Sequence, residues 1–320
     1  MKKCIVFIFI TFILILSSCV PPDIFEPENF KPLTEKVVFC GTFGFPGNLD
    51  GQLNSPYDIT TDKYGNIYVA DTANNRIQKF NPDGAFLLSW GILGSGDGQF
   101  NTPIAVKSDS AGNIWVADTL NNRIQKFDSN GKFLMKFGEV GIGNGQFQSP
   151  YDLGIDPRNG NIIVADTGNA RIQVFNSKGK FLRTWGEVGT GNYQFFALYS
   201  IDVDHLGNIY ALDVAHKELK KFSPEGKLLR KWGQVGNNDR EWQMPFRLTV
   251  DPNGYIYVSD PVSVKILKFS PQGDFILKFG EQGGKPQNLQ TPVGIFADKT
   301  KIYISDFNTG SIKIFQTVLE

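Results

Sequence analysis

The sequence predicts an all-β protein, a six-bladed β-propeller whose blades are four-stranded antiparallel sheets. Three observations predict this fold. A unit of 47 or 48 residues occurs six times, each unit holds four short strand-like runs, and the two ends of the chain complement each other. Self-similarity at such a period is typical of propellers and solenoids.

An aromatic residue followed by glycine marks each repeat. The six pairs are Phe43-Gly44, Trp90-Gly91, Phe137-Gly138, Trp185-Gly186, Trp232-Gly233 and Phe279-Gly280. An aspartate closes an apolar run in every unit, at Asp71, Asp118, Asp166, Asp213, Asp260 and Asp306. A proline opens five of the units, and Leu198 takes its place in the sixth.

The first unit shows the four strands that we expect in each blade, over residues 57–61, 66–70, 76–80 and 86–90. These runs are rich in β-branched and aromatic residues, and Gly65-Asn66 and Asp83-Gly84 supply the turns of tight hairpins. No window shows an apolar period of 3.6 residues long enough for a core helix. Phe100, Phe147, Phe195, Trp242 and Leu289, in the linkers between units, are expected to fill the seams between blades.

The ends of the chain predict a closed ring. The last unit stops at Phe315-Gln316 after its third strand, and residues 39–44 align with the fourth strand of the next unit, 86–91. The N-terminal strand is therefore expected to complete the C-terminal blade, so that no blade edge stays open.

Residues 1–18 are predicted to be a signal peptide. Lys2 and Lys3 precede an apolar stretch from Ile5 to Leu16, which ends in Leu16-Ser17-Ser18-Cys19. This ending resembles the lipobox of bacterial lipoproteins, and the resemblance implies that Cys19 is acylated and holds the protein on a membrane. The alternative is a plain secretory signal with an incidental cysteine.

Residues 19–35 are interpreted as the lipidated cysteine and a proline-rich tether, and residues 36–320 as the propeller. The tether carries Pro21, Pro22, Pro27 and Pro32, as extended linkers do. Because Val20 is not aspartate, outer-membrane sorting is expected if the source is Gram-negative, with the protein in the cell envelope. Cys40, which aligns with Leu87, is expected to be a small buried residue in a strand.

The charge balance argues against a nucleic-acid partner. Removal of residues 1–18 leaves 30 basic and 32 acidic residues, a net charge of −2. A near-neutral surface lacks the basic footprint that nucleic-acid binding requires.

Several segments resemble the NHL repeat, among them Gly65–Thr72, Asn75–Phe80, Gly112–Phe127 and Asn161–Phe175. The resemblance covers residues 39–315 and implies a six-bladed propeller with its ligand face at one end of the central channel. It implies no single activity, because the family includes metal-dependent lyases, RNA-binding modules, sensor domains and bacterial lipoproteins.

The first three repeats share an Asp-Thr-x-Asn-x-Arg element, with Asp71, Asn74 and Arg76 in the first. We interpret it as scaffolding: the Asp and Asn bond turn backbone, and the Arg pairs with a carboxylate. The alternative is a ring of ligand groups. The fourth to sixth repeats depart from this element.

The chain contains only two histidines, His205 and His216, in consecutive turns of the fourth unit. Consecutive turns of an up-and-down blade lie on opposite faces, so a histidine-rich metal site or a nucleophile–histidine triad is not expected. This absence favours a protein without catalytic activity.

The candidate site lies where the innermost strands begin. Its residues are aromatic or charged where close packing favours small side chains, and they are Tyr57, Asp58, Tyr151, Asp152, Tyr199, Phe246 and Arg247. They predict a shallow pocket at the channel mouth with aromatic walls and a few polar groups. The alternative is that the charged members pair across the channel.

These features predict an envelope-anchored, non-catalytic binding or scaffold lipoprotein that recognises a small polar, carbohydrate-like or peptide ligand. No cofactor is expected. One alternative is a lactonase-type hydrolase in which Asp58, Asp152 and Asp202 bind Ca²⁺. Another is an adhesin that binds other proteins.

Overall fold

The computed structural model describes residues 35–233, 242–280 and 282–319. The predicted signal peptide, Cys19 and nearly all of the predicted tether lie outside the described residues. The chain divides into two units, and residues 37–317 form the larger, compact one. The other unit comprises residues 1–36 and 318–320, of which the structure describes only positions 35, 36, 318 and 319. No helix among the described residues is long and apolar enough to span a membrane.

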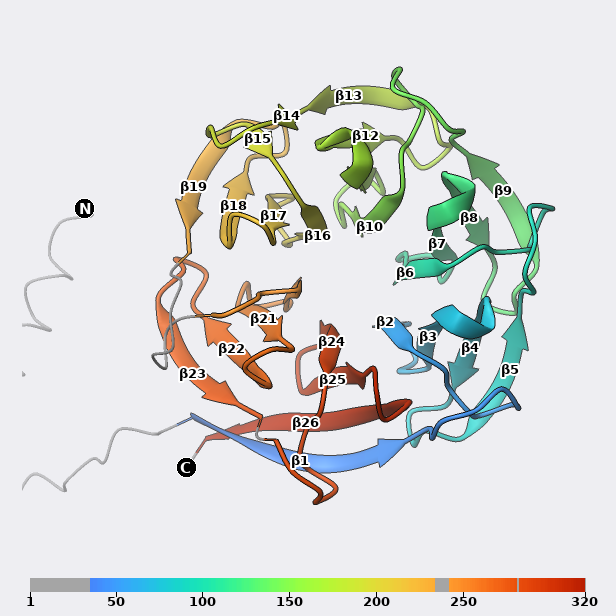
Figure 1. The fold of residues 1–320 in the computed structure, drawn as a ribbon, viewed down its shortest axis with the longest axis vertical. Helices are drawn as coiled ribbons and strands as arrows, with labels where there is room; N and C mark the ends of the chain where they lie inside the picture. The colour runs from blue at the N-terminus through green and yellow to red at the C-terminus, as the bar shows by residue number, and fades with distance from the viewer. Residues whose placement is uncertain (1–34, 234–241, 281, 320) are drawn as a thin grey trace, which may run out of the picture. The chain divides into compact units, whose positions relative to one another are not determined.

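Six four-stranded antiparallel sheets surround a common axis, and in each the first strand lies innermost (Figure 1). Blades 1 to 3 are β2 (Pro56–Thr61), β3 (Ile67–Asp71), β4 (Arg76–Phe80) and β5 (Phe86–Trp90); β6 (Pro103–Ser108), β7 (Ile114–Asp118), β8 (Arg123–Phe127) and β9 (Phe133–Phe137); and β10 (Pro150–Ile155), β11 (Ile162–Asp166), β12 (Arg171–Phe175) and β13 (Phe181–Trp185).

Blades 4 to 6 are β16 (Leu198–Val203), β17 (Ile209–Asp213), β18 (Glu218–Phe222) and β19 (Leu228–Trp232); β20 (Arg247–Val250), β21 (Ile256–Asp260), β22 (Lys265–Phe269) and β23 (Phe275–Phe279); and β24 (Pro292–Ala297), β25 (Lys301–Asp306) and β26 (Ser311–Leu319) with β1 (Glu35–Phe43). The six-bladed all-β fold is confirmed.

The N-terminal strand closes the ring, as predicted. The last sheet has the order β1-β26-β25-β24, and the Thr42 hydroxyl donates to the Ile312 carbonyl at 3.0 Å. The expectation that Cys40 is buried was wrong, because this outermost strand turns alternate side chains to solvent. Cys40 is exposed, and so is its counterpart Leu87.

Side chains from the linkers fill the seams between blades. Leu53, Phe100, Phe147, Phe195, Trp242 and Leu289 are all buried. The glycine of the aromatic-Gly pair makes room for them: Gly91 has a φ of +100°, and a Cβ there would lie 2.4 Å from the Phe100 ring. In five of the six pairs the dipeptide thus reflects both a positive φ and a packing contact, whereas Gly233 has no positive φ and lies against the Lys217 carbonyl.

Short 3₁₀ helices follow the second strand of blades 1 to 3: η1 (Thr72–Asn74), η2 (Thr119–Asn121) and η3 (Thr167–Asn169). Each faces a linker, and the linker between blades 3 and 4 forms the two-residue parallel pair β14 (Glu187–Val188) and β15 (Gln194–Phe195). Isolated parallel bridges occupy the same place in four other linkers, at Pro46–Leu53, Leu93–Phe100, Val140–Phe147 and Gln282–Leu289.

The Asp-Thr-x-Asn-x-Arg element fixes these linkers. In blade 2, Arg123 donates through Nε to the buried Asp118 carboxylate at 2.7 Å. Its two Nη atoms donate to the carbonyls of Ser95, Gly96 and Gln99 in the linker. Gln125 bonds Asp118 and the Gln99 carbonyl as well. The same bonds from Arg to Asp recur in blades 1 and 3, as the scaffolding interpretation predicted.

Candidate functional site

The first residues of the innermost strands lie on the face that carries the 3₁₀ helices and the linkers. Pro56 at the start of β2 pairs with Asp71, the residue before η1, and the equivalent pairing recurs in blades 2, 3, 4 and 6. The predicted site residues that follow these positions therefore gather at one end of the ring axis. We call this end the mouth.

Four aromatic rings form a closed circuit at the mouth. The Tyr57 ring lies 5.8 Å from that of Tyr151 and 5.7 Å from that of Phe246, measured between centroids. Tyr199 closes the circuit by stacking on Tyr151 at 4.5 Å and packing edge-on against Phe246 at 5.8 Å. All four rings are half-buried, so they present part of their surface to solvent. We call these four residues the aromatic collar.

A hydrogen bond between two hydroxyls strengthens the collar. The Oη atoms of Tyr57 and Tyr151 lie 2.5 Å apart, from strands in blades 1 and 3. Burial is the main cause that raises the pKa of Tyr57, and the neighbouring Tyr151 adds to it. Burial raises the pKa of Tyr151 too. Both phenols are therefore neutral at physiological pH and remain able to donate hydrogen bonds.

One further ring belongs to the mouth and was not predicted. Phe307 packs edge-on against Tyr57 with their centroids 6.0 Å apart. It follows Asp306 at the position where blades 1 to 3 carry threonine, whose hydroxyl donates to the backbone of the next blade. The change from Asp-Thr to Asp-Phe in the sixth repeat was the signal available in the sequence.

Beneath the collar lies a buried charged cluster, which brings the remaining predicted residues together. Arg247 donates through Nε to Asp58 at 3.2 Å and through Nη2 to Asp152 at 2.9 Å. Its Nη2 also forms an ion pair with Asp58, at 2.8 Å. The Lys107 ammonium lies 3.7 Å from Asp58. The charged members thus pair across the axis, which is the alternative that the sequence left open.

The cluster alternates with small residues around the ring. Asp58, Asp152 and Arg247 belong to blades 1, 3 and 5, whereas the equivalent residues of blades 2, 4 and 6 are Ala105, Ser200 and Gly294. A Cβ at Gly294 would lie 2.2 Å from the Tyr57 carbonyl oxygen. Small residues in alternate blades give the three long side chains the space they need at the axis.

The carboxylates of the cluster also join neighbouring blades. Asp58 accepts from the backbone N–H of Val106 in blade 2 at 3.0 Å. Asp152 accepts from the N–H of Ile201 in blade 4 at 2.9 Å, and Asp202 from that of Val250 in blade 5 at 2.9 Å. These side chains therefore hold the inner strands together as well as balancing charge.

Burial and the neighbouring charges together shift the pKa values of the cluster. Burial raises the pKa of Asp152 to about 6, against the opposing effects of Arg247 and Lys107. Burial alone would lower the pKa of Lys107 and of Arg247, but the neighbouring carboxylates raise both. In the described part of the chain, the buried Nη1 of Arg247 has no hydrogen-bond partner.

An open depression of about 360 Å³ adjoins the collar between blades 1 and 2. Tyr57 and Phe307 form its aromatic side. Its other lining residues are small or carry amides and hydroxyls, namely Ser55, Thr72, Ala73, Asn75, Asn101 and Thr102. Ligand-sized space with an aromatic side and a polar side is thus present at the mouth.

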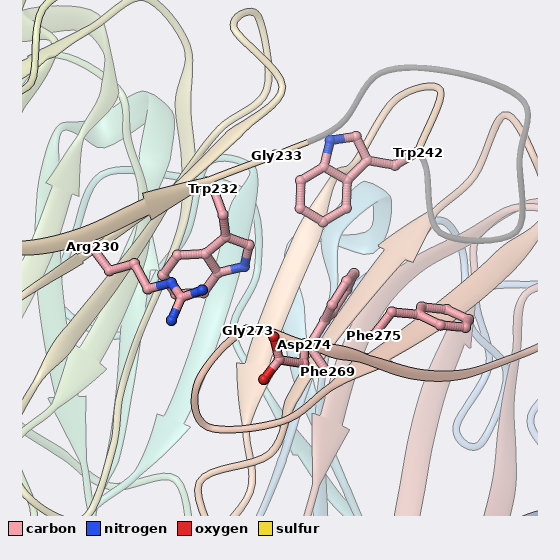
Figure 2. A pocket seen from close by; sticks show the side chains of 8 residues that line it. All are labelled: Arg230, Trp232, Gly233, Trp242, Phe269, Gly273, Asp274 and Phe275. Carbon is pink, nitrogen blue, oxygen red and sulfur yellow. The ribbon is translucent and has the colours of Figure 1, made fainter.

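A second cavity, of about 450 Å³, lies away from the axis at the seam between blades 4 and 5 (Figure 2). Trp232 and Trp242 line it, with Arg230 and Asp274 at its edge.

The two histidines lie in different turns, as expected. His205 lies between β16 and β17, and His216 lies between β17 and β18, where its Nδ1 is 2.7 Å from the buried Asp213 carboxylate. Among residues 35–233, 242–280 and 282–319, no group of three His, Cys, Asp or Glu side chains is placed to hold a metal ion.

Comparison with known families agrees with this architecture. A family model described as a 6-bladed beta-propeller matches residues 103–172 and 158–232, and the NHL repeat model matches residues 53–80. The chain is an NHL-repeat six-bladed β-propeller.

Curated relatives match only a short part of the chain. The E3 ubiquitin-protein ligase TRIM71 of Bos taurus is 53% identical over 45 residues, which are 14% of this chain and 5% of that protein. Protein lin-41 of Caenorhabditis elegans is 40% identical over 65 residues, 20% of this chain and 6% of that protein. The propeller chain thus spans about a twentieth of the length of these relatives.

Solved structures share the whole ring. A Bacteroides thetaiotaomicron protein of unknown function has a TM-score of 0.65 and 16% identity, covering 89% of this chain and 76% of that one. Virginiamycin B lyase of Staphylococcus aureus has a TM-score of 0.60 and 12% identity, with 89% and 99% covered. A gluconolactonase of Xanthomonas campestris has a TM-score of 0.62 and 12% identity, with 90% and 98% covered. At these identities, the likeness establishes the fold alone.

Proposed function

We propose that this propeller is a non-catalytic binding module of the cell envelope, anchored through Cys19, which recognises a small carbohydrate-like ligand at its mouth. The observation that carries the proposal is the half-buried aromatic collar beside an open depression. Partly exposed aromatic rings next to amides and hydroxyls suit a ligand with one apolar and one polar side.

A sugar fits these groups better than a charged ligand does. The C–H bonds of a sugar ring pack on an aromatic face, and its hydroxyls bond amides such as Asn75 and Asn101, which line the depression. The charges of Asp58, Asp152 and Arg247 are buried and already paired. They would support the collar from below rather than contact the ligand.

Calorimetric titration of the full chain with neutral mono- and oligosaccharides tests the proposal. The Phe307→Ala variant is expected to lose about tenfold or more in affinity for any sugar that binds, because Phe307 lines the depression. Tyr64→Ala is the matched control, since Tyr64 is an exposed aromatic in the β2–β3 turn on the opposite face. Equal losses in both variants, or none in Phe307→Ala, would move the site away from the mouth.

The alternative of a Ca²⁺-dependent hydrolase has a separate test. Asp58 and Asp152, two of its predicted ligands, bond the Arg247 guanidinium, a cation that would oppose a bound metal ion. We therefore expect the melting temperature to stay unchanged on addition of Ca²⁺ or EDTA. A melting temperature that rises with Ca²⁺ and falls with EDTA would favour the hydrolase.

A peptide ligand remains the second candidate at the same mouth. An extended peptide would need hydrogen-bonding partners along the collar, which the Tyr57–Tyr151 hydroxyl pair and the amides of the depression offer. Competition between the bound sugar and a random peptide pool separates the two ligand classes.

A further inference from the structure

Blade 4 departs from the other five blades at one point of the mouth face. In every blade, a residue shortly before the innermost strand donates its backbone N–H to the aspartate that ends the second strand. In blade 4 this residue is Phe196, which donates to Asp213 at 2.9 Å and is 65% exposed. In the other blades it is an amide, namely Asn54, Asn101, Gln148, Gln243 and Gln290.

A second departure lies beside the first. Three residues after the aspartate, blades 1 to 3 carry an asparagine whose side chain donates to a carbonyl of the preceding linker; these residues are Asn74, Asn121 and Asn169. Blade 4 carries His216 at this position, and the centroid of its ring lies 6.2 Å from that of Phe196. The two departures from the repeat therefore meet in space.

The buried Asp213 carboxylate fixes both residues. It accepts from the N–H groups of Phe196 at 2.9 Å and Ala197 at 3.0 Å, and it lies 2.7 Å from Nδ1 of His216. Because the carboxylate acts as an acceptor, we assign the hydrogen of the neutral imidazole to Nδ1, so that Nε2 is an acceptor. Nε2 has no hydrogen-bond partner among the described residues, and the His216 side chain is 22% exposed.

The linker of blade 4 is held without the imidazole. In blade 2, Gln125 lies seven residues after the aspartate and donates to a linker carbonyl. Lys220 takes this position in blade 4 and donates through Nζ to the carbonyls of Gly191 and Gln194. His216 therefore does not have the linker-holding role of the asparagines, and its Nε2 is open to a ligand.

We propose that Phe196 and His216 form a second sugar subsite, the blade-4 subsite, so that the ligand is a chain of several sugar units; this inference rests on the proposed function. The Phe196 ring would pack against the C–H face of one unit, and Nε2 of His216 would accept a hydrogen bond from its hydroxyl. Phe196 precedes Tyr199 of the collar by three residues, so their Cα atoms lie no more than about 10 Å apart. A linear oligosaccharide bound on the collar would therefore continue onto this subsite.

The chemistry of the pair favours a neutral hydroxyl over an anion or a metal ion. A neutral Nε2 accepts hydrogen bonds and cannot donate one to a carboxylate or phosphate oxygen, and the buried Asp213 disfavours negative charge nearby. A metal ion would need further ligands, and no group of three His, Cys, Asp or Glu side chains is placed to hold one in the part of the chain that the structure describes.

Calorimetric titration of the full chain with linear mono- to hexasaccharides of glucose and of N-acetylglucosamine tests this inference. The two variants are Phe196→Asn and His216→Asn, which introduce residues that other blades carry at the same positions. His205→Asn is the matched control, because His205 is exposed in the β16–β17 turn on the opposite face. Thermal melting should be nearly unchanged in all three variants, since these side chains lie at the surface.

We expect the affinity for the series that binds to rise about tenfold from the disaccharide to the hexasaccharide. Phe196→Asn and His216→Asn should each lose this gain and keep the affinity for the disaccharide, whereas His205→Asn should keep both. Because the chain has only two histidines, nitrogen-15 spectra resolve the imidazoles directly. The hexasaccharide should shift the Nε2 resonance of His216 and leave that of His205 in place.

An affinity that does not depend on chain length, or a gain that survives in both variants, would overturn the blade-4 subsite while leaving the mouth as a sugar site. Binding that Phe196→Asn weakens and Phe307→Ala does not would contradict the mouth and leave the subsite standing. No binding by either series would contradict both. A His216 shift caused by a random peptide pool but by no sugar would assign the subsite to a peptide.

Discussion

Arg247 of blade 5 donates through Nε to Asp58 of blade 1 at 3.2 Å, although 189 residues separate them in the chain. Its Nη2 atom forms an ion pair with the same carboxylate at 2.8 Å. The same Nη2 atom bonds Asp152 of blade 3 at 2.9 Å. One guanidinium thus links three alternate blades at the axis, directly beneath the aromatic collar. The stability of the ring and the shape of the candidate site therefore depend on one side chain.

Replacement of this side chain should destabilise the protein strongly. Arg247→Met leaves Asp58 and Asp152 buried without their shared cation, at a cost of about 3–5 kcal/mol in the free energy of unfolding at pH 7. Chemical denaturation measures the change. The same replacement at exposed Arg230 should cost no more than about 0.5 kcal/mol, so comparable losses at the two positions would contradict the axial role of Arg247.

The raised pKa of Asp152 predicts a pH dependence of stability. The folded-state pKa is about 6, against 3.8 for an unperturbed aspartate, so between these values the folded state holds more protons than the unfolded state. This group therefore makes the protein less stable as pH rises from about 4 to about 6. Denaturation at several pH values should show that Asp152→Asn removes part of this slope. Asp83→Asn, at an exposed turn, should leave it intact.

The hydrogen bonds that fix the linkers should make a measurable contribution to the free energy of unfolding. Arg123→Ala removes four hydrogen bonds and leaves Asp118 buried without its cation, which should cost about 3 kcal/mol or more. Lys132→Ala in the exposed β8–β9 turn is the control and should change stability little. Equal, small effects of both changes would mean that blade packing alone positions the linkers.

The proposed membrane attachment through Cys19, a residue outside the described part of the chain, can be tested in cells. If Cys19 is the acylated residue, a clickable fatty acid supplied to expressing cells should label the chain, and Cys19→Ala should abolish the label. Cys40→Ala is the matched control, because Cys40 is an exposed thiol that should not affect labelling. A label that survives in Cys19→Ala and disappears in Cys40→Ala would place the lipid elsewhere.

The repeat made most of the fold predictable from the sequence. The aromatic-Gly pairs and the turn glycines placed strand ends correctly because a left-handed backbone tolerates few residues other than glycine. The element around Asp118 and Arg123 was predicted as scaffolding for a similar reason, since its recurrence suits a structural role. Its bonds to the linker carbonyls were not predicted, because they join residues about 25 positions apart.

The candidate site was predictable in its members but not in its pairing. Tyr57, Tyr151, Tyr199 and Phe246 were identified by their position after the residue that opens each unit, and the ring brings them together. Whether Asp58 meets Arg247 or solvent depends on side-chain length across the axis. The small residues at the equivalent positions of alternate blades, Ala105, Ser200 and Gly294, were the sign in the sequence that the charged side chains have room to meet across the axis. The predicted burial of Cys40 was wrong because alignment with Leu87 fixes a residue's position in the strand but not its exposure to solvent.

Strand β1 pairs with β26, which contains the last described residues of the chain. Strand β1 thus lacks its partner in the sheet until β26 has been synthesised. Up to that moment the growing chain exposes an unpaired edge at each end of its partial ring. Closure of the ring therefore follows the synthesis of β26, although each of the other five four-stranded sheets is built from consecutive strands and needs no distant segment.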